Sequence, residues 1–209
     1  MEFVYFLLEN YSKRSLTEDT DRYVAISGLE ARIARARRRQ SRYGTFEEFL
    51  HRNLMWQSSD NMMKRIEYKT RNVPSWSWMA YNGGIQFMDI PFGKVDWIVN
   101  LRFDEERKST LIADVGKFRN YKMKPDGDHY AVLNSFRMKI GWIWYDVDEG
   151  KNLREERCVV VGRKSNKGVK KYYILVVRPT GVDGEYSRVG VGLIRSDCVV
   201  RERVGVRVV

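Results

Sequence analysis

The spacing of hydrophobic and polar positions changes about one third of the way along the chain. In the first third, Ile26, Leu29 and Ile33 recur at helical spacing, and the apolar opening segment 1–10 predicts a further amphipathic helix. From Trp76 onward, apolar and polar residues alternate with period two, which is typical of strands. The chain is therefore predicted to have an α+β fold, with N-terminal helices packed on an antiparallel β-rich sandwich or partly open barrel.

Helix boundaries are predicted from capping signals. Thr17 is followed by two acidic residues and is expected to cap the first long helix. Gly28 lies inside that helix at a cost in helix propensity, so we expect it to allow a close contact with another helix. Thr45 and Glu48 form a capping box, which predicts a second helix that ends near Trp56.

Nine strands separated by turn residues are predicted after the helices. They cover residues 75–81, 85–88, 95–103, 110–117, 135–146, 158–163, 172–178, 187–194 and 198–209. Turns are marked by Pro125–Gly127, Asp148–Gly150, Lys167–Gly168 and Asp183–Gly184. The polar segment 57–72 is expected to connect the two parts. Residues 1–72 then form a helical layer and residues 73–209 a β-rich body, both around one continuous core.

The most distinctive stretch is Val73–Phe87. Pro74 favours an extended residue before it, and alternation places Trp76 and Trp78 on one face of the strand that follows. The Asn82–Gly83 pair is a strong turn signal, so the stretch is predicted to form a β-hairpin. Both tryptophans are interpreted as core anchors, because burying one indole removes roughly 150–250 Å² from water. An aromatic ligand cage is the alternative.

Trp142 and Trp144 repeat this arrangement in a later predicted strand, where they share one face. We expect them to pack in the core as well. A groove lined by their rings, or an exposed protein-binding patch, is the alternative.

The composition fits one domain with a sizeable core and no membrane span. The 209 residues are 43% hydrophobic and 31% charged, and no apolar run approaches the roughly 20 residues that a bilayer requires. The opening segment lacks a basic region, so no signal peptide is predicted. Cys158 and Cys198 precede valine runs and are interpreted as core residues rather than a disulfide. We therefore expect a reducing compartment, the cytoplasm, with the nucleus as an alternative.

The charge is strongly basic, at +11 with a pI of about 9.7. Much of it gathers in residues 32–42, where a continuous helix would line up four arginines on one side. The candidate contacts to an anionic partner are Arg32, Arg35, Arg38, Arg39 and Arg42. Such a row could neutralise the phosphates of a nucleic acid. A solvated helix end favoured by the helix dipole and a nuclear-localisation signal are the other interpretations.

No motif for catalysis, a cofactor or a metal is found. His51 and His129 are the only histidines, and neither has a metal-ligand partner at helix or hairpin spacing. Gly190 and Gly192 lack the third glycine of a dinucleotide fingerprint. The carboxylates at 104–106 and 146–149 are interpreted as turns, so the chain is predicted not to be an enzyme.

Three ordered blocks resemble fungal heterokaryon-incompatibility (HET) proteins. Pro74, Ser75, Trp76, Ser77 and Trp78, followed by Gly83, resemble the signature downstream of the HET domain. Tyr186, Arg188, Gly190 and Gly192 are similar to the closing hairpin of that family. Residues 11–17, Asp21–Arg22 and 25–28 resemble the helical segment between the HET domain and the first signature.

The resemblance implies a non-catalytic regulatory or recognition region in fungal non-self recognition and control of cell death, with a protein partner. Any death-inducing activity would belong to a HET domain, which has no counterpart in this chain. The segment Gly44–Phe46 departs from the family, which commonly has Gly-x-Trp there. The competing interpretation is a basic nucleic-acid-binding protein that uses the arginines of residues 32–42.

Overall fold

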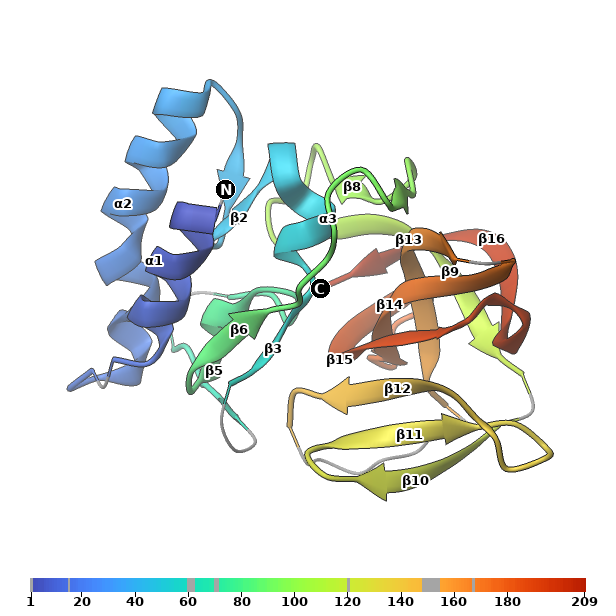
Figure 1. The fold of residues 1–209 in the computed structure, drawn as a ribbon. Coiled ribbons are helices and arrows are strands. Elements are labelled where there is room, and N and C mark those ends of the chain that lie inside the picture. Colours follow the sequence, from blue (N-terminus) through green and yellow to red (C-terminus); the bar gives the residue numbers. More distant parts are fainter. Residues whose placement is uncertain are drawn as a thin grey trace.

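The computed structural model describes the chain except for residues 1, 15, 60–62, 70–71, 120, 148–154 and 167, and except for the side chains of residues 166 and 203. Two helices lie at one side of the molecule and a curled sheet at the other, with short strands between them (Figure 1). The α+β prediction is confirmed. The turns predicted at Asp148–Gly150 and at Lys167 lie outside the described residues.

Helices α1 (Glu2–Ser12) and α2 (Arg22–Arg37) form the N-terminal layer, as the helical spacing predicted. Helix α1 packs on strand β6, where the Tyr5 and Phe87 rings stack with their centroids 4.3 Å apart. The predicted cap is wrong, because the short helix η1 (Asp19–Asp21) intervenes and α2 begins after Asp21. The contact expected at Gly28 is also wrong, since a Cβ there would meet nothing within 4 Å.

The capping box predicted at Thr45 does not form. Thr45 belongs to strand β2 (Thr45–Phe46), which pairs with β1 (Ser41–Arg42), and its buried hydroxyl has no partner among the described residues. The second helix is correspondingly short, consisting of η2 (Glu47–Phe49) and α3 (Leu50–Asn53). The Phe46 amide donates instead to Asn53 Oδ1 at 2.7 Å. Strand pairing has therefore displaced the first turn of the expected helix.

The hairpin predicted at 73–87 is also wrong. Residues 75–80 form turns and the helix η3 (Trp78–Ala80), in which Ser77 Oγ accepts from the Met79 amide. Strand β5 (Tyr81–Asn82) pairs with β4 (Lys64–Arg65), and β6 (Ile85–Phe87) pairs with β3 (Trp56–Ser58). The expected connector 57–72 thus supplies two strands of this region.

Five strands close into a barrel. They are β9 (Leu111–Phe118), β13 (Arg157–Asn166), β14 (Val169–Pro179), β15 (Glu185–Arg195) and β16 (Val199–Val208). Neighbours are antiparallel except β15 and β16, whose parallel pairing at Glu185–Arg207 and Tyr186–Val208 completes the circle. The barrel is closed, where a sandwich or a partly open barrel was predicted. Helix η4 (Ser196–Cys198) joins β15 to β16.

A three-stranded meander extends the sheet from β15. It consists of β10 (Lys122–Asp126), β11 (His129–Leu133) and β12 (Lys139–Tyr145), and β12 pairs with the second half of β15. The first two of these strands were not predicted, although their turn was. The strand predicted at 95–103 is reduced to β7 (Asp96–Trp97) and β8 (Arg102–Phe103), which pair with β13 and β9.

The sheet carries an apolar cluster on each face. Register places Val159, Leu175 and Val191 on one face, and these join Trp76 and Leu54 from the N-terminal part in what we call the barrel cluster. The opposite face packs under the meander. That meander cluster includes Cys158, Val160, Ile174, Ile143 and Cys198. A third, helical cluster joins Val4, Leu8, Ile26, Trp56 and Trp78.

Both cysteines are buried in the meander cluster, as predicted for core residues, and their thiols are free. Burial raises the pKa of the Cys158 thiol to about 12. Within the described part of the chain, no helix is both long enough and apolar enough to cross a membrane.

Candidate functional site

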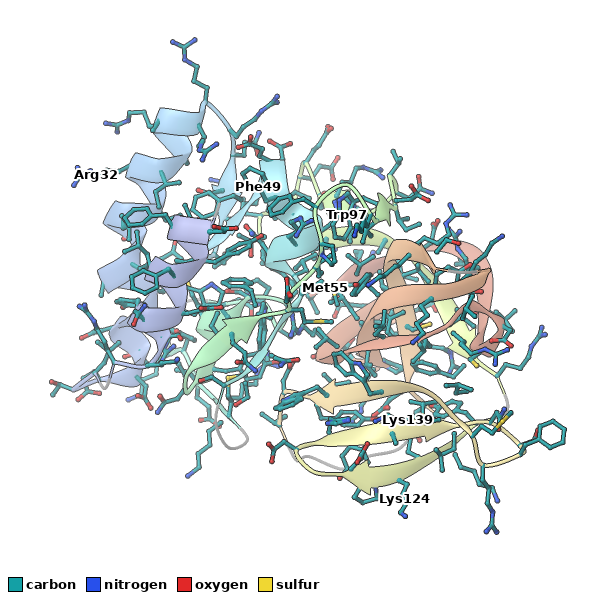
Figure 2. The ribbon with its side chains drawn as sticks, viewed as in Figure 1. Arg32, Phe49, Met55, Trp97, Lys124 and Lys139 are labelled. Atoms are coloured by element: carbon teal, nitrogen blue, oxygen red, sulfur yellow. The ribbon has the colours of Figure 1, made fainter. Side chains whose placement is uncertain are left out.

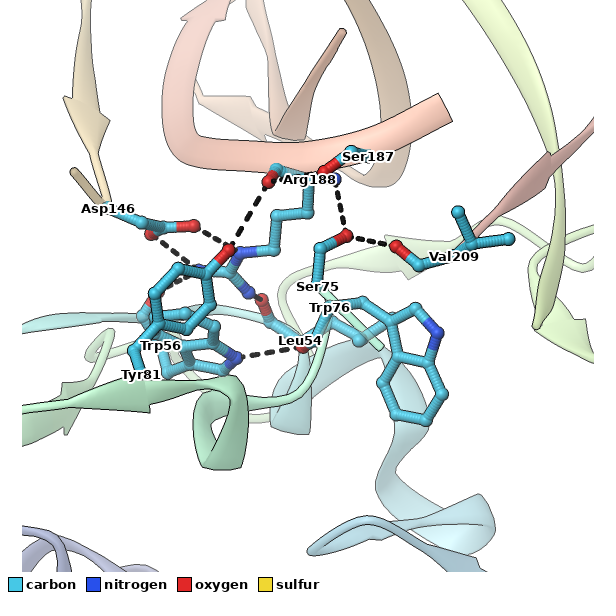
Figure 3. Close-up of polar contacts among 9 residues, drawn as sticks. All are labelled: Leu54, Trp56, Ser75, Trp76, Tyr81, Asp146, Ser187, Arg188 and Val209. Atoms are coloured by element: carbon cyan, nitrogen blue, oxygen red, sulfur yellow. Dashed lines mark hydrogen bonds and ion pairs between the residues drawn. The ribbon is translucent and has the colours of Figure 1, made fainter. Parts of the chain in front are cut away.

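Arg188 is the centre of a highly connected buried polar group. It lies on β15 with 1% of its surface exposed, and it forms an ion pair with Asp146 just beyond the end of β12 (Figure 3). Arg188 Nε donates to Asp146 Oδ2 at 2.8 Å and Nη2 donates to Oδ1 at 3.0 Å. Such a forked contact is the strongest geometry available to a guanidinium and a carboxylate.

The other guanidinium donors of Arg188 reach the N-terminal part of the chain. Nη1 donates to the Leu54 carbonyl and Nη2 to the Trp56 carbonyl, each at 2.7 Å, and the guanidinium lies 3.3 Å from the centre of the Trp56 ring. The Trp56 indole in turn donates to the Trp76 carbonyl at 3.1 Å. Arg188 therefore joins the barrel, the end of the meander and the segment after α3.

Ser75 completes this junction. Its hydroxyl oxygen accepts from the Arg188 amide at 2.7 Å and donates to the Val209 carbonyl. That carbonyl also accepts from the Ser75 amide at 3.1 Å, and the Tyr81 hydroxyl donates to the Arg188 carbonyl at 3.4 Å. The second and third blocks of the HET resemblance in chain order thus meet at a hydrogen bond between residues 113 positions apart.

The electrostatics of the Arg188 junction depend on burial. Desolvation raises the pKa of the Asp146 carboxyl, and the adjacent Arg188 guanidinium opposes this shift by favouring the ionised form. Because both side chains have 0% exposure, neither can contact a ligand from solvent. The arrangement holds the strands together.

A second buried arginine, Arg22, joins the helical block to the first signature. Its Nη2 donates to the Ser12 carbonyl at 3.0 Å and its Nη1 to the Gly83 carbonyl at 3.3 Å. The guanidinium lies 5.9 Å from the centre of the Trp78 ring, and the Tyr11 hydroxyl donates to the Arg22 carbonyl at 3.0 Å. Arg22 is 2% exposed, so this junction is also internal.

The glycines of the last block are required because a larger residue would collide with the neighbouring strand. A Cβ on Gly190 would collide with the Trp144 carbonyl oxygen, and one on Gly192 would lie 2.6 Å from the Trp142 carbonyl oxygen. Both glycines therefore let β12 and β15 approach closely. Gly83 has φ of +132°, a conformation that favours glycine.

The other signature residues are also placed in the structure. Ser75, Trp76, Ser77 and Trp78 are fully buried, and the Ser77 hydroxyl donates to the Tyr43 carbonyl at 2.8 Å. Pro74 is buried and Tyr186 is half-buried.

The arginine row predicted on α2 is not formed. The helix ends at Arg37, and Arg38 adopts a left-handed conformation with φ of 52°, so Arg39 leaves the helix axis. Arg42 lies in β1, donates to the Asp104 carbonyl at 2.5 Å and covers the Phe103 ring at 4.8 Å. Its guanidinium is thus engaged in contacts within the chain. Four of the five candidate arginines remain at least partly exposed at this end of the molecule: Arg32, Arg35, Arg38 and Arg39.

The core position expected for this pair holds in part for Trp144, which packs against the barrel cluster, but not for Trp142. Both rings are half-buried, and they lie on one face of β12 beside His129. The His129 ring is 6.1 Å from the Trp142 ring and 6.2 Å from the Trp144 ring, centre to centre. His129 begins β11 rather than lying in a loop, and its Nε2 is 3.4 Å from Asp126 Oδ2.

His51 lines a cleft of about 470 Å³ between β1 and β8, together with Arg42, Glu47, Arg102 and Glu105. It is partly exposed, as predicted. Its Nε2 lies 2.7 Å from the Ile98 carbonyl oxygen, and burial lowers the pKa of the imidazole. Among the described residues, no group of three His, Cys, Asp or Glu side chains is placed to hold a metal ion.

The fold and its junctions define the class: an α+β protein with a closed five-stranded barrel, in which buried Arg188 joins the barrel to the segment after α3 and buried Arg22 joins the helices to the turn at Gly83. No protein-family model, no curated protein and no solved structure matches this chain. The motif residues described above therefore remain the only basis for the HET resemblance.

Sequence reasoning found Arg188 and Ser75 as signature residues but missed their partners. Asp146 was assigned to a turn, and Arg22 was named only as part of a block. A signal was present for the ion pair, because Asp146 directly follows an apolar strand and Arg188 lies within another. An ionisable residue embedded in such a strand is seldom buried without a partner.

Proposed function

We propose that this chain is a non-catalytic recognition region of the HET type, which works in fungal non-self recognition and the control of cell death through a protein partner. One observation carries the proposal. The residues of the three blocks, far apart in sequence, converge on two buried arginines: Arg22 joins the first block to the second, and Arg188 joins the second to the third.

Contacts between the blocks are what a shared family scaffold would require, and they support the proposal. Here Ser75 bonds to Arg188 and Gly83 bonds to Arg22. Gly190 and Gly192 permit the close approach of β12 to β15. These residues serve one scaffold, which leaves recognition to the exposed surface. A cytoplasmic location, with the nucleus as the alternative, belongs to the same proposal.

The test of this function is made in fungal cells. The full chain is expressed alone and together with a HET-domain protein, and cell viability is measured. We expect no loss of viability from the chain alone and a changed rate of death when the HET-domain protein is present. Death caused by the chain alone, or no effect on the HET-domain protein, would contradict the proposal.

The non-catalytic part is tested separately with purified chain. We expect no turnover of NAD or nucleoside triphosphates above a buffer control. If turnover were seen and disappeared in the His51→Gln variant, the cleft beside Arg42 and Arg102 would become the active site, and the proposal would be wrong.

A second candidate function is nucleic-acid binding at the end of α2. The observation that favours it is the exposure of Arg32, Arg35, Arg38 and Arg39 in one short segment. Retention on heparin is compared between the wild type and the triple variant Arg35→Ser, Arg38→Ser and Arg39→Ser. Salt-sensitive retention that the variant loses would support this function, and equal retention would exclude it.

A further inference from the structure

The meander presents an aromatic surface that the HET-type proposal does not use. The register of β12 with β11 and β15 pairs Trp142 with Ala131 and Leu193, and places Trp144 and His129 on the same side of the sheet. We call His129, Trp142, Trp144 and Leu193 the tryptophan face. All four residues are half-buried, so part of each side chain contacts solvent.

Basic side chains border the tryptophan face on two sides. On β10, Lys122 and Lys124 are exposed, and their pairing with Leu133 and Ala131 puts them on the same side as Trp142. On β14 and β15, Lys171 pairs with Arg195, and the alternation that contains Tyr173 and Leu193 brings both to this side. Figure 2 labels Lys124 and Lys139 on the meander.

Two acidic residues near the face are paired with basic side chains, whereas Asp128 is exposed. Asp126 Oδ2 lies 2.6 Å from Lys139 Nζ and 3.4 Å from His129 Nε2. Asp197 accepts from Arg195, with Oδ2 at 2.5 Å from Nη2. Lys122, Lys124 and Lys171 thus leave the border with an excess of positive charge.

We propose that the tryptophan face binds single-stranded nucleic acid. Indole rings accept any base by stacking, and lysines on both sides of the rings suit the phosphates of a strand that crosses the meander. A duplex hides the faces of its bases, so the rings would gain nothing from it. The charged borders disfavour an apolar protein partner, whose docking would have to desolvate the lysines.

This inference goes beyond the proposed function and differs from the second candidate, because it assigns the binding surface to β10–β12 rather than to α2. The two surfaces lie on different elements at opposite sides of the molecule (Figure 1). Variants on one surface therefore serve as controls for the other.

The experiment uses the full chain and a fluorescently labelled oligothymidylate of roughly 12 nucleotides, within the site sizes of such surfaces. Binding is followed by anisotropy, and stacking is followed by quenching of the chain's tryptophan fluorescence. We expect salt-sensitive binding with quenching. Trp142→Ala and Trp144→Ala should each weaken it about 10-fold or more. Lys122→Ala with Lys124→Ala should lower the salt slope by about 0.7 for each phosphate that is no longer neutralised.

Matched controls keep the result specific. The Arg35→Ser, Arg38→Ser, Arg39→Ser variant and the exposed aromatic variant Phe6→Ala should bind as the wild type does. The double variant Trp142→Phe, Trp144→Phe retains aromatic rings, so it should recover most of the binding even if the alanine variants fold poorly.

Four outcomes would overturn the inference. They are no binding of the oligonucleotide, binding without quenching, equal affinity for duplex DNA, and loss of binding in the α2 variant rather than in the Trp142 and Trp144 variants.

Discussion

The chain contains two pairs of tryptophans with the same spacing, and the structure places them in opposite environments. Trp76 and Trp78 are fully buried, whereas Trp142 and Trp144 are half-buried, with Trp144 packed against the barrel cluster. The first pair lies in a turn and a short helix, so its rings enter two different clusters. The second pair lies in a regular strand and shares one face.

The difference between the pairs comes from their partners rather than from their spacing. The Trp76 indole donates to the Ser109 carbonyl at 3.2 Å, and its ring packs edge-on against Tyr43 at 5.8 Å. Around Trp142 the neighbouring ring is His129, and no helix covers this part of the sheet in the view of Figure 1. An i, i+2 aromatic pair therefore does not by itself predict burial.

The largest loss of stability is expected at Arg188, which bonds to the Trp56 carbonyl next to the buried tryptophan pair. Arg188→Met leaves Asp146 without its counter-ion, so the free energy of unfolding should fall by about 3–5 kcal/mol. Urea unfolding measures this loss. The double variant Arg188→Met, Asp146→Leu removes both charges and should lose less than the single variant. If the double variant instead lost the sum of the losses of Arg188→Met and Asp146→Leu measured singly, the ion pair would not explain the effect.

A smaller effect should separate the two tryptophan pairs directly. Trp76→Leu creates a cavity and leaves the Ser109 carbonyl without its donor, so we expect a loss of about 2–4 kcal/mol. Trp142→Leu should cost less than about 1 kcal/mol, because its ring is already partly solvated. Thermal unfolding of both variants tests this, and equal losses would mean that Trp142 is a core residue after all.

Ser75→Ala should give the next largest loss of folding stability. The substitution leaves the buried Arg188 amide without its acceptor, which costs about 1–3 kcal/mol. Ser77→Ala is the matched control for a buried serine that bonds to Tyr43 and Met79 instead. If only the Ser75 variant lowers the protection of the Arg188 amide against hydrogen exchange, the junction is specific.

The smallest predicted effect is a pH dependence from His51. Burial lowers the pKa of this imidazole below 6.5, so the unfolded chain binds the proton more readily than the folded one. The stabilisation is fully present above the unfolded pKa and is lost as the pH falls through 6.5 toward the folded pKa. Between pH 7.5 and 5 this should amount to less than about 1 kcal/mol, and His51→Gln should abolish it.

Long, regular patterns allowed part of the fold to be predicted. The helix containing Ile26 and the five strands of the barrel, each at least eight residues long, all contain a regular apolar pattern or run. Short elements were predicted poorly. At Ser77 a side-chain bond to the Met79 amide stabilises a helical turn, which competes with the strand that alternation suggested.

The sites were harder to predict than the fold. The pairing of Arg188 with Asp146 spans 42 residues, and its bond to the Leu54 carbonyl spans 134. No local pattern encodes interactions at that distance. Likewise, the exposure of Trp144 depends on which strands the helices cover, and this is settled only by the tertiary fold.

The closure of the barrel has a consequence for how it opens. The parallel pairing between β15 and β16 involves only two residue pairs, Glu185–Arg207 and Tyr186–Val208, whereas β14 and β15 pair along most of their length. Local fluctuations should separate this short seam more readily than the long β14–β15 pairing. Once parted, it would offer two unpaired strand edges to a neighbouring copy, so domain exchange between molecules can be initiated there.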